Sequence, residues 1–259
     1  DYFQDRADGF GKEFGVPDDR RYDGLSCYKK LLTGDLDAVA IESPPYFHPA
    51  QAAAAVDAGK HVFVAKPIAV DVPGCQSIAE SGRQATAKKL VFLIDFQTRA
   101  NELYQEAVKR VQNGDIGRIV NGVAVYYCGM MFAGHQKHFA ANKSDPSAKR
   151  RSWPIFRSLS GDIITEQNIH ALDVASWIMD APPVAAMGVG GRKARTGSGD
   201  INDHFNVVYT YPGDTAISFT SRQFGKGGGD IGCTVFGSRG TVDTHYFGSV
   251  SIAGNTPYK

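Results

Sequence analysis

The regular alternation of strand and helix patterns in the first 95 residues is the feature that most constrains the fold. Short apolar runs at 38–41, 61–65 and 90–95 are separated by helix-forming segments at 49–58 and 72–89. Two further helices are expected at 1–15 and 27–32. Parallel neighbours need a long crossover, usually a helix, so this alternation predicts βαβ units with a parallel sheet and right-handed crossovers.

The pattern changes after residue 97. An amphipathic helix follows, with Leu103, Ala107, Val108 and Val111 on one face and Gly114 at its end. Strand patterns then dominate, at 118–127, 184–192, 204–211, 216–224, 231–238 and 240–247, and "TYPGDTA" reads as a hairpin turn. We therefore expect two domains, an α/β domain at 1–97 and an α+β domain at 98–259 with a large, open, mainly antiparallel sheet.

A segment of roughly thirty residues, 129–159, shows no clear periodicity and exceeds the usual loop length. It is rich in lysine and arginine. Two interpretations stay open, a solvated basic loop and a lid or partner arm.

Lys66 and Pro67 end the strand pattern "HVFVA". Proline cannot donate to a ladder and restricts the residue before it to an extended conformation. Lys66 is therefore held at the carboxyl end of a parallel strand, where ligands bind in open α/β sheets. A lysine that simply reaches solvent is the alternative.

A largely apolar helix is expected over 160–180, "SGDIITEQNIHALDVASWIMD". Glu166, His170 and Asp173 share one face at a spacing of i, i+4, i+7, with Ile163 and Trp177 beside them. Because unpaired buried charge is costly, such a stripe favours a functional site. A surface helix-stabilising pair and a metal site are alternatives, although no second histidine lies at ligand spacing. We expect no metal.

These residue types suit the oxidation of an alcohol. A neutral histidine can take the hydroxyl proton near pH 7, and a lysine ammonium can stabilise the developing negative charge on oxygen. Glu166 and Asp173 would orient the imidazole of His170. We expect Lys66 and His170 to meet at the mouth of the parallel sheet, with a nicotinamide as hydride acceptor.

Three segments carry a family resemblance that covers essentially the whole chain. They are "SPPYFHPAQAAAAVDAGKHVFVAKPIA", "GDIGRI" and "GDIITEQNIHALDVASWIM". They resemble three regions of the glucose–fructose oxidoreductase, inositol dehydrogenase and rhizopine catabolism (Gfo/Idh/MocA) family. In the same order, these regions are the segment from T-P-N-x-x-H to E-K-P, the entry into the sheet domain and the D-x-x-x-H-x-x-D helix.

The resemblance implies an N-terminal Rossmann domain that binds NAD, with NADP possible, and an enzyme that oxidises a secondary hydroxyl of a sugar, polyol or derivative. Lys66 is then the E-K-P lysine and His170 the base. The cofactor would contact Asp1, Ser43, Pro44, His48, Lys66, Pro67 and Gln97. Apart from the resemblance, Gln97 and Arg99 follow the strand pattern at 90–95 and should point into the mouth of the sheet. Arg99, Tyr126 or Tyr127, and His204 are candidates for the substrate side, with ordinary packing or surface solvation as the alternative for each. Relatives are usually dimers or tetramers built through the open sheet.

The chain departs from the family pattern in four places. Ala65 replaces the glutamate of E-K-P, Pro45 replaces the asparagine, and Glu166 replaces the aspartate before the histidine. No G-x-G-x-x-G lies between a strand and a helix, and "GFGKEFG" is not preceded by an apolar strand. We therefore expect a portion of a longer protein, without the first strand, glycine turn and helix and without the C-terminal end. Asp1 then fits the ribose-binding acid, which favours NAD, or only the start of a helix.

Composition limits the remaining function classes. The net charge of +1 indicates neither nucleic acid nor a membrane surface as a partner, and no apolar run approaches the roughly 20 residues that span a bilayer. Four scattered cysteines make a poor disulfide framework, so the cytoplasm is the default compartment, although an export signal could precede residue 1. Two other functions stay open, an NAD-dependent redox glycosidase or lyase and a non-catalytic binding or scaffold protein.

Overall fold

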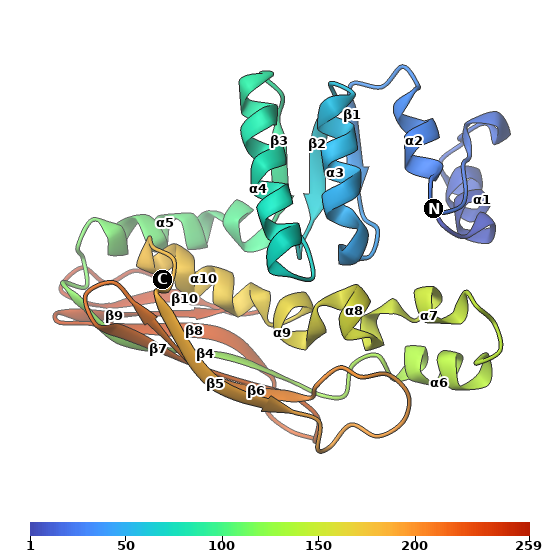
Figure 1. Cartoon of the computed structure of the whole chain (residues 1–259). Helices are drawn as coiled ribbons and strands as arrows, with labels where there is room; N and C mark the ends of the chain where they lie inside the picture. The colour runs from blue at the N-terminus through green and yellow to red at the C-terminus, as the bar shows by residue number, and fades with distance from the viewer. The chain divides into compact units, whose positions relative to one another are not determined.

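The computed structural model describes all residues from Asp1 to Lys259. The chain divides into two compact units, Asp1–Asp95 and Phe96–Lys259, which are described separately (Figure 1).

The first unit is a three-stranded parallel sheet with helices. Its strands β1 (Ala38–Ile41), β2 (His61–Ala65) and β3 (Phe92–Asp95) lie side by side in chain order. Its helices are α1 (Gln4–Glu13), α2 (Cys27–Leu32), α3 (His48–Asp57) and α4 (Val72–Ala87), with short 3-10 turns η1 (Asp18–Arg20) and η2 (Pro45–Phe47). The predicted parallel α/β arrangement is confirmed.

Local signals set the helix ends around this sheet. Gly59 adopts a φ of 72° just after α3, a conformation that glycine reaches without strain. The Asp71 side chain caps α4 by accepting a hydrogen bond of 2.8 Å from the Gly74 N–H. Val62 and Val64 of β2 are almost completely buried against Val56 of α3 and its neighbours, so β2 lies at the centre of the core.

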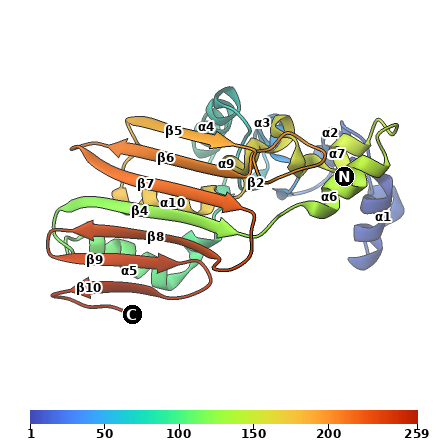
Figure 2. The same ribbon diagram turned by 90° about the horizontal axis from the view of Figure 1, so that it is seen from below.

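The second unit is built on a seven-stranded sheet of order β10-β9-β8-β4-β7-β6-β5 (Figure 2). Its strands are β4 (Ile119–Cys128), β5 (Ala185–Gly191), β6 (His204–Tyr211), β7 (Thr215–Gln223), β8 (Asp230–Gly237), β9 (Gly240–His245) and β10 (Val250–Gly254). Only β4 and β7 pair in parallel, so the sheet is mainly antiparallel, as predicted. β6 and β7 form the predicted hairpin.

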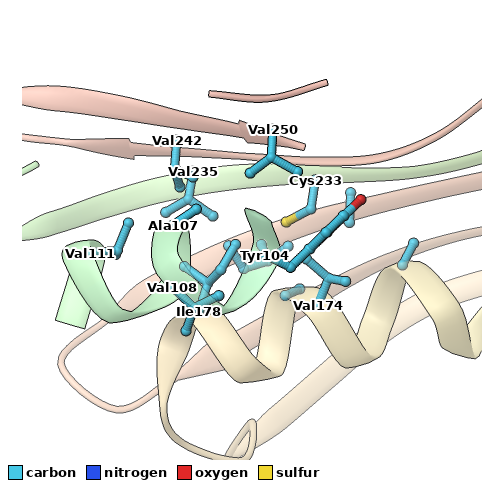
Figure 3. Close-up of a cluster of buried hydrophobic side chains, with 14 of the residues drawn as sticks. Tyr104, Ala107, Val108, Val111, Val174, Ile178, Cys233, Val235, Val242 and Val250 are labelled. Carbon is cyan, nitrogen blue, oxygen red and sulfur yellow. The ribbon is translucent and has the colours of Figure 1, made fainter. Parts of the chain in front are cut away.

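Two helices, α5 (Glu102–Gln112) and α10 (Ile169–Met179), cover one face of this sheet. Figure 3 shows how Tyr104 and Val108 of α5 meet Val174 and Ile178 of α10 against strand residues such as Val235 and Val250. The prediction that Leu103 belongs to the buried face of α5 is wrong. The buried seam runs through Tyr104, Ala107, Val108 and Val111, at the helical spacing i, i+3, i+4, i+7, which leaves Leu103 44% exposed.

The other face of the sheet carries no helix, and Figure 2 shows its strands in front of α5 and α10. Side chains alternate between the two faces along each strand. On β4, for example, Ala124 and Tyr126 are buried toward the helices whereas Val123 is exposed on the open face.

The prediction of an irregular segment at 129–159 is wrong, because most of it is helical. It contains α6 (Ala133–Ala141), α7 (Ala148–Arg151), η4 (Trp153–Ile155) and the start of α8 (Arg157–Ser160). Tertiary contacts hold these short helices. Phe139 and Phe156 pack on a small separate core that includes Ile155, and the Gln136 amide donates to the carbonyls of Thr196 and Ser198.

The single helix predicted over 160–180 is also wrong. Gly161 and Asp162 have φ values of 77° and 72°, which separates α8 from α9 (Asp162–Glu166). A turn at Gln167 and Asn168 then separates α9 from α10. Both residues keep helical backbone angles, but their N–H groups both donate to the Ile163 carbonyl, at 3.0 and 2.8 Å, which interrupts the regular ladder of hydrogen bonds.

Candidate active site

The carboxyl ends of the three parallel strands lie level with one another. Ile41 pairs with Val64, and Ala65 pairs with Asp95. The segments that leave β1 and β2, beginning at Glu42 and Lys66, therefore start at the same edge of the sheet. This is the edge at which open α/β sheets bind ligands.

His48 ties these two segments together. Its buried ring lies between two backbone carbonyls, with Nε2 2.6 Å from the Ser43 oxygen and Nδ1 2.9 Å from the Pro67 oxygen. Burial lowers the pKa of His48, and the two carbonyl contacts oppose that shift. The Ser43 hydroxyl donates to Gln51 at 2.6 Å. The structure thus places His48 as an internal brace that fixes the backbone at Ser43 and Pro67.

Two carboxylates flank Ala65. Asp95 is its partner on β3, and Glu42 lies one residue beyond the paired Ile41 on β1. Burial raises the pKa of the Glu42 carboxyl, and repulsion from Asp95 raises it further. The edge of the sheet therefore keeps negative charge beside Lys66 even though residue 65 is alanine.

Asp1 precedes α1. One of its carboxylate oxygens accepts a hydrogen bond of 2.8 Å from the Phe3 N–H, and its amino group donates to the Tyr22 carbonyl. The glycines of "GFGKEFG" lie in and just after α1, so this sequence forms no strand–helix turn.

In the second unit, the break between α9 and α10 holds a buried polar cluster. Glu166, His170 and Asp173 are all at least nine-tenths buried. Gln167 connects the cluster to the sheet, because it accepts a hydrogen bond of 2.7 Å from the Tyr126 hydroxyl and donates one of 2.7 Å to Glu166. Burial raises the pKa of Tyr126, with smaller contributions from Cys128 and Glu166, so this hydroxyl stays protonated and donates.

An aromatic ring lies against the His170 imidazole. The ring of Tyr246 is 5.2 Å away between centroids and tilted by 58°. The Tyr246 hydroxyl in turn accepts a hydrogen bond from the Gln97 amide. Residues from α10, from the end of β9 and from the segment η3 (Gln97–Ala100) thus converge on one place.

Asp173 has a different partner from the expected one. The Arg99 guanidinium binds both of its oxygens, with Nε 2.9 Å from one and Nη2 2.8 Å from the other. The same guanidinium lies 5.1 Å from the ring of Trp177. Asp173, which was expected to orient the base, and Arg99, which was expected to contact the substrate, therefore form one ion pair.

Tyr127 and His204 lie away from this cluster. Both are cross-strand neighbours of Arg222, on the open face of the sheet, whereas Tyr126 points to the helix face. The Arg222 guanidinium lies over the Tyr127 ring, and His204 contacts the Asp203 carboxylate at 2.6 Å. The alternation of side chains along a strand is the physical reason for this separation.

The sequence did not single out Tyr246, Gln167 or Glu42 as site residues. Tyr246 is distant in sequence from His170, and no local periodicity links them. Glu42 could have been found, because it follows a predicted strand at the same edge as Lys66.

The residues present fit the nicotinamide side of a dinucleotide site. Rigid loops at Ser43 and Pro67, carboxylates at Glu42 and Asp95, and the Lys66 ammonium all follow the carboxyl ends of adjacent parallel strands. Carboxylate oxygens can accept hydrogen bonds from ribose hydroxyls, and a lysine ammonium can donate hydrogen bonds to oxygen atoms. No group of three or more His, Cys, Asp or Glu side chains in residues 1–259 has the arrangement of a metal site.

Comparisons with known proteins agree with this geometry. Residues 3–93 match the profile of the oxidoreductase family with an NAD-binding Rossmann fold, and residues 104–243 match the GFO/IDH/MocA C-terminal domain. Inositol 2-dehydrogenase 3 of Saccharopolyspora erythraea is 26% identical over 213 residues, which are 81% of this chain and 55% of that protein. The scyllo-inositol 2-dehydrogenase (NAD(+)) of Bacillus subtilis is 24% identical over 221 residues, 83% of this chain and 57% of that protein.

Solved structures share the fold. Levoglucosan dehydrogenase, solved with NADH and levoglucosan, has a TM-score of 0.77 at 20% identity, over 98% of this chain and 65% of that one. The WlbA dehydrogenase from Bordetella pertussis, solved with NADH and UDP-GlcNAcA, has a TM-score of 0.78 at 18% identity, over 100% of this chain and 69% of that one.

The chain spans little more than half the length of the curated relatives it matches. None of its helices is both long and apolar enough to cross a membrane. The two matched domains together account for most of the chain, and they confirm the resemblance seen in the sequence motifs. The chain therefore belongs to the GFO/IDH/MocA family of oxidoreductases, with an N-terminal unit of the NAD-binding Rossmann fold.

Proposed function

We propose that the protein is an NAD-dependent oxidoreductase that oxidises a secondary hydroxyl of a polyol, sugar or sugar derivative. The observation that carries this proposal is the buried His170, which lies with Glu166 in a polar cluster of the family's C-terminal domain. A buried histidine beside a carboxylate suits proton abstraction near neutral pH. The inositol and levoglucosan dehydrogenases among the relatives support the substrate class.

The roles follow from residue chemistry. The nicotinamide, when bound, accepts the hydride. His170 takes the hydroxyl proton, and the Lys66 ammonium stabilises negative charge on the same oxygen. Glu166, held by Gln167, favours the protonated imidazole that forms. Asp173 acts through Arg99, whose guanidinium it holds in place.

The proposal assigns the cofactor to the edge of the parallel sheet. Ser43, Pro44, Lys66 and Pro67 would contact its nicotinamide side, with His48 as the brace between them. Asp1 and Gln97 would be further contacts to the cofactor, and Asp1 would contact its adenosine ribose. NAD is favoured over NADP because an aspartate there accepts a hydrogen bond from the ribose 2′-hydroxyl and repels a 2′-phosphate.

The test is a spectroscopic assay with defined probes. Absorbance at 340 nm is followed with NAD or NADP and myo-inositol, scyllo-inositol, levoglucosan and simple aldoses. We expect turnover with at least one of these. Lys66→Met and His170→Asn are each expected to lower kcat by roughly 10²–10⁴-fold, whereas Lys143→Met, an exposed lysine on the segment after α6, leaves it unchanged.

The other outcomes separate the alternatives. Cofactor binding without turnover on any probe would support a binding or scaffold protein. Cleavage of aryl glycosides that needs NAD, with no net NADH, would support a redox glycosidase. Turnover that survives both substitutions would contradict the assigned roles.

A further inference from the structure

Two hydrogen bonds hold Tyr246, one at its backbone and one at its side-chain hydroxyl. It follows β9, and its backbone N–H donates to the Ile231 carbonyl on β8 at 2.8 Å. Its hydroxyl accepts a hydrogen bond from the Gln97 amide on η3. These two anchors fix where the Tyr246 ring lies.

The His170 imidazole lies against the Tyr246 ring. The two rings lie 5.2 Å apart between centroids, tilted by 58°, within the range of favourable aromatic contacts. Phe247, the next residue, packs edge-on against the Tyr246 ring with centroids 4.7 Å apart and is 88% exposed. Tyr246 therefore contacts both the buried imidazole and an exposed aromatic side chain.

We propose that Tyr246 is a positioning residue that sets the orientation of the His170 imidazole. The helix α10 fixes the backbone of His170, but the second side-chain torsion of histidine is broad and roughly two-fold. A neighbouring ring that cannot move restricts that torsion. A general base acts only when its nitrogen points at the proton it removes, so this restriction bears directly on the rate.

The hydroxyl of Tyr246 has a separate task from its ring. Because the hydroxyl accepts from Gln97, it anchors the ring, and the ring contacts the imidazole. The inference rests on the proposed function in that His170 is the base. It assigns to residues 97 and 246, which lie 149 positions apart, a shared effect on that base.

The test compares Tyr246→Leu, which removes the ring, with Tyr246→Phe, which keeps it. Phe247→Leu is the matched control, since it removes an aromatic ring from the same loop. For each variant, kcat and KM are measured with NAD and the best probe of the panel. NMR spectra of the imidazole C–H groups are recorded in parallel, with His170 assigned from the spectrum of His170→Gln. Thermal unfolding confirms that each variant is folded.

We expect Tyr246→Leu to lower kcat by roughly 10- to 100-fold with KM unchanged, because the base is misdirected while substrate binding is kept. Its His170 resonances should shift and broaden. Tyr246→Phe should restore most of the rate and the wild-type His170 resonances, and Phe247→Leu should match the wild type.

Two results would overturn the inference. If Tyr246→Phe loses as much rate as Tyr246→Leu while its His170 resonances match those of the wild type, the hydroxyl acts by itself and the ring does not position the base. If the His170 resonances of Tyr246→Leu lose only the ring-current shift of the missing ring and do not broaden, the ring does not set the imidazole. Should the wild type turn over no probe, the proposed function fails, and the NMR comparison still decides whether Tyr246 orients His170.

Discussion

The charge that residue 65 can carry depends on the two carboxylates beside it. Its side chain lies between Glu42 and Asp95 at the edge of the parallel sheet, on the face that the paired residues share. Burial is the main cause that raises the pKa of Glu42, and repulsion from Asp95 adds to it. A third negative charge at residue 65, where the E-K-P pattern has glutamate, would add to this repulsion.

The first prediction concerns this position. Ala65→Glu should lower the free energy of unfolding at pH 7.5 by about 0.5–1 kcal/mol relative to Ala65→Gln, because like charges on adjacent strands repel. Urea unfolding of both variants measures the difference. Glutamine is the control for size, and equal stability of the two variants would show that Glu42 and Asp95 do not repel residue 65.

A second prediction concerns the pair of Arg99 and Asp173. Arg99→Ala should lower the free energy of unfolding by roughly 1–3 kcal/mol, because the buried Asp173 carboxylate loses its charged hydrogen-bond donor. Arg110→Ala is the matched control, since Arg110 pairs with Glu106 on the surface of α5 and such pairs contribute about 0.3–0.5 kcal/mol. A double variant with Asp173→Ala should lose less than the sum of the two single changes. Additivity would show that the two side chains are not coupled.

Among the elements of the structure, β8 and β9 carry a charge cluster on the open face of their sheet. His245 contacts Asp230 through Nδ1 and Asp243 through Nε2, both at 2.9 Å. The hydrogen bond to Asp230 is the main cause that raises the pKa of His245, and Asp243 adds to it.

This cluster predicts a pH dependence of stability. Because the folded pKa of His245 is raised, its contribution is fully present below the unfolded pKa of about 6.5 and is lost as pH rises through the folded pKa. The free energy of unfolding should therefore fall between about pH 6 and pH 8 more steeply in the wild type than in His245→Gln. Urea unfolding across that range measures the two slopes. Identical slopes would mean that the carboxylates do not hold the protonated ring.

The whole molecule presents an open sheet face in the second unit. A row of side chains crosses it from Met187 through Val208 and Ser218 to Val123, and the three apolar members are 78%, 40% and 42% exposed respectively. Phe236, on neighbouring β8, is 41% exposed. Contiguous exposed apolar residues mark association surfaces more often than isolated ones do. We propose that the protein is a homodimer or homotetramer built through this face, as expected from the family resemblance.

The corresponding prediction is a change of oligomeric state. Val123→Asp combined with Val208→Asp should convert the assembly to monomers, because two charges would be buried without partners in an apolar interface. Light scattering after size-exclusion chromatography gives the mass. Val72→Asp, at an exposed valine of α4, is the control and should leave the mass unchanged. A wild-type protein that is monomeric at micromolar concentration would contradict the proposal.

The sequence by itself determined the elements whose signals are local. The strands of the parallel sheet lie where short apolar runs were expected, and α3 and α4 lie between them. The same local reading placed Lys66 at a strand end and found His170 and Glu166 as buried polar residues, because burial follows from apolar neighbours within one or two turns.

Only the tertiary structure decided which distant residues meet. It broke the expected helix at Gln167, whose amide is held by Tyr126 and Glu166. It paired Asp173 with Arg99, 74 residues away, and placed the Tyr246 ring against the His170 imidazole. The local sequence pattern indicates which residues are buried, but it does not indicate which residues they contact. The partner is chosen by contacts between segments far apart in the chain, and their free energy exists only once the whole unit has folded.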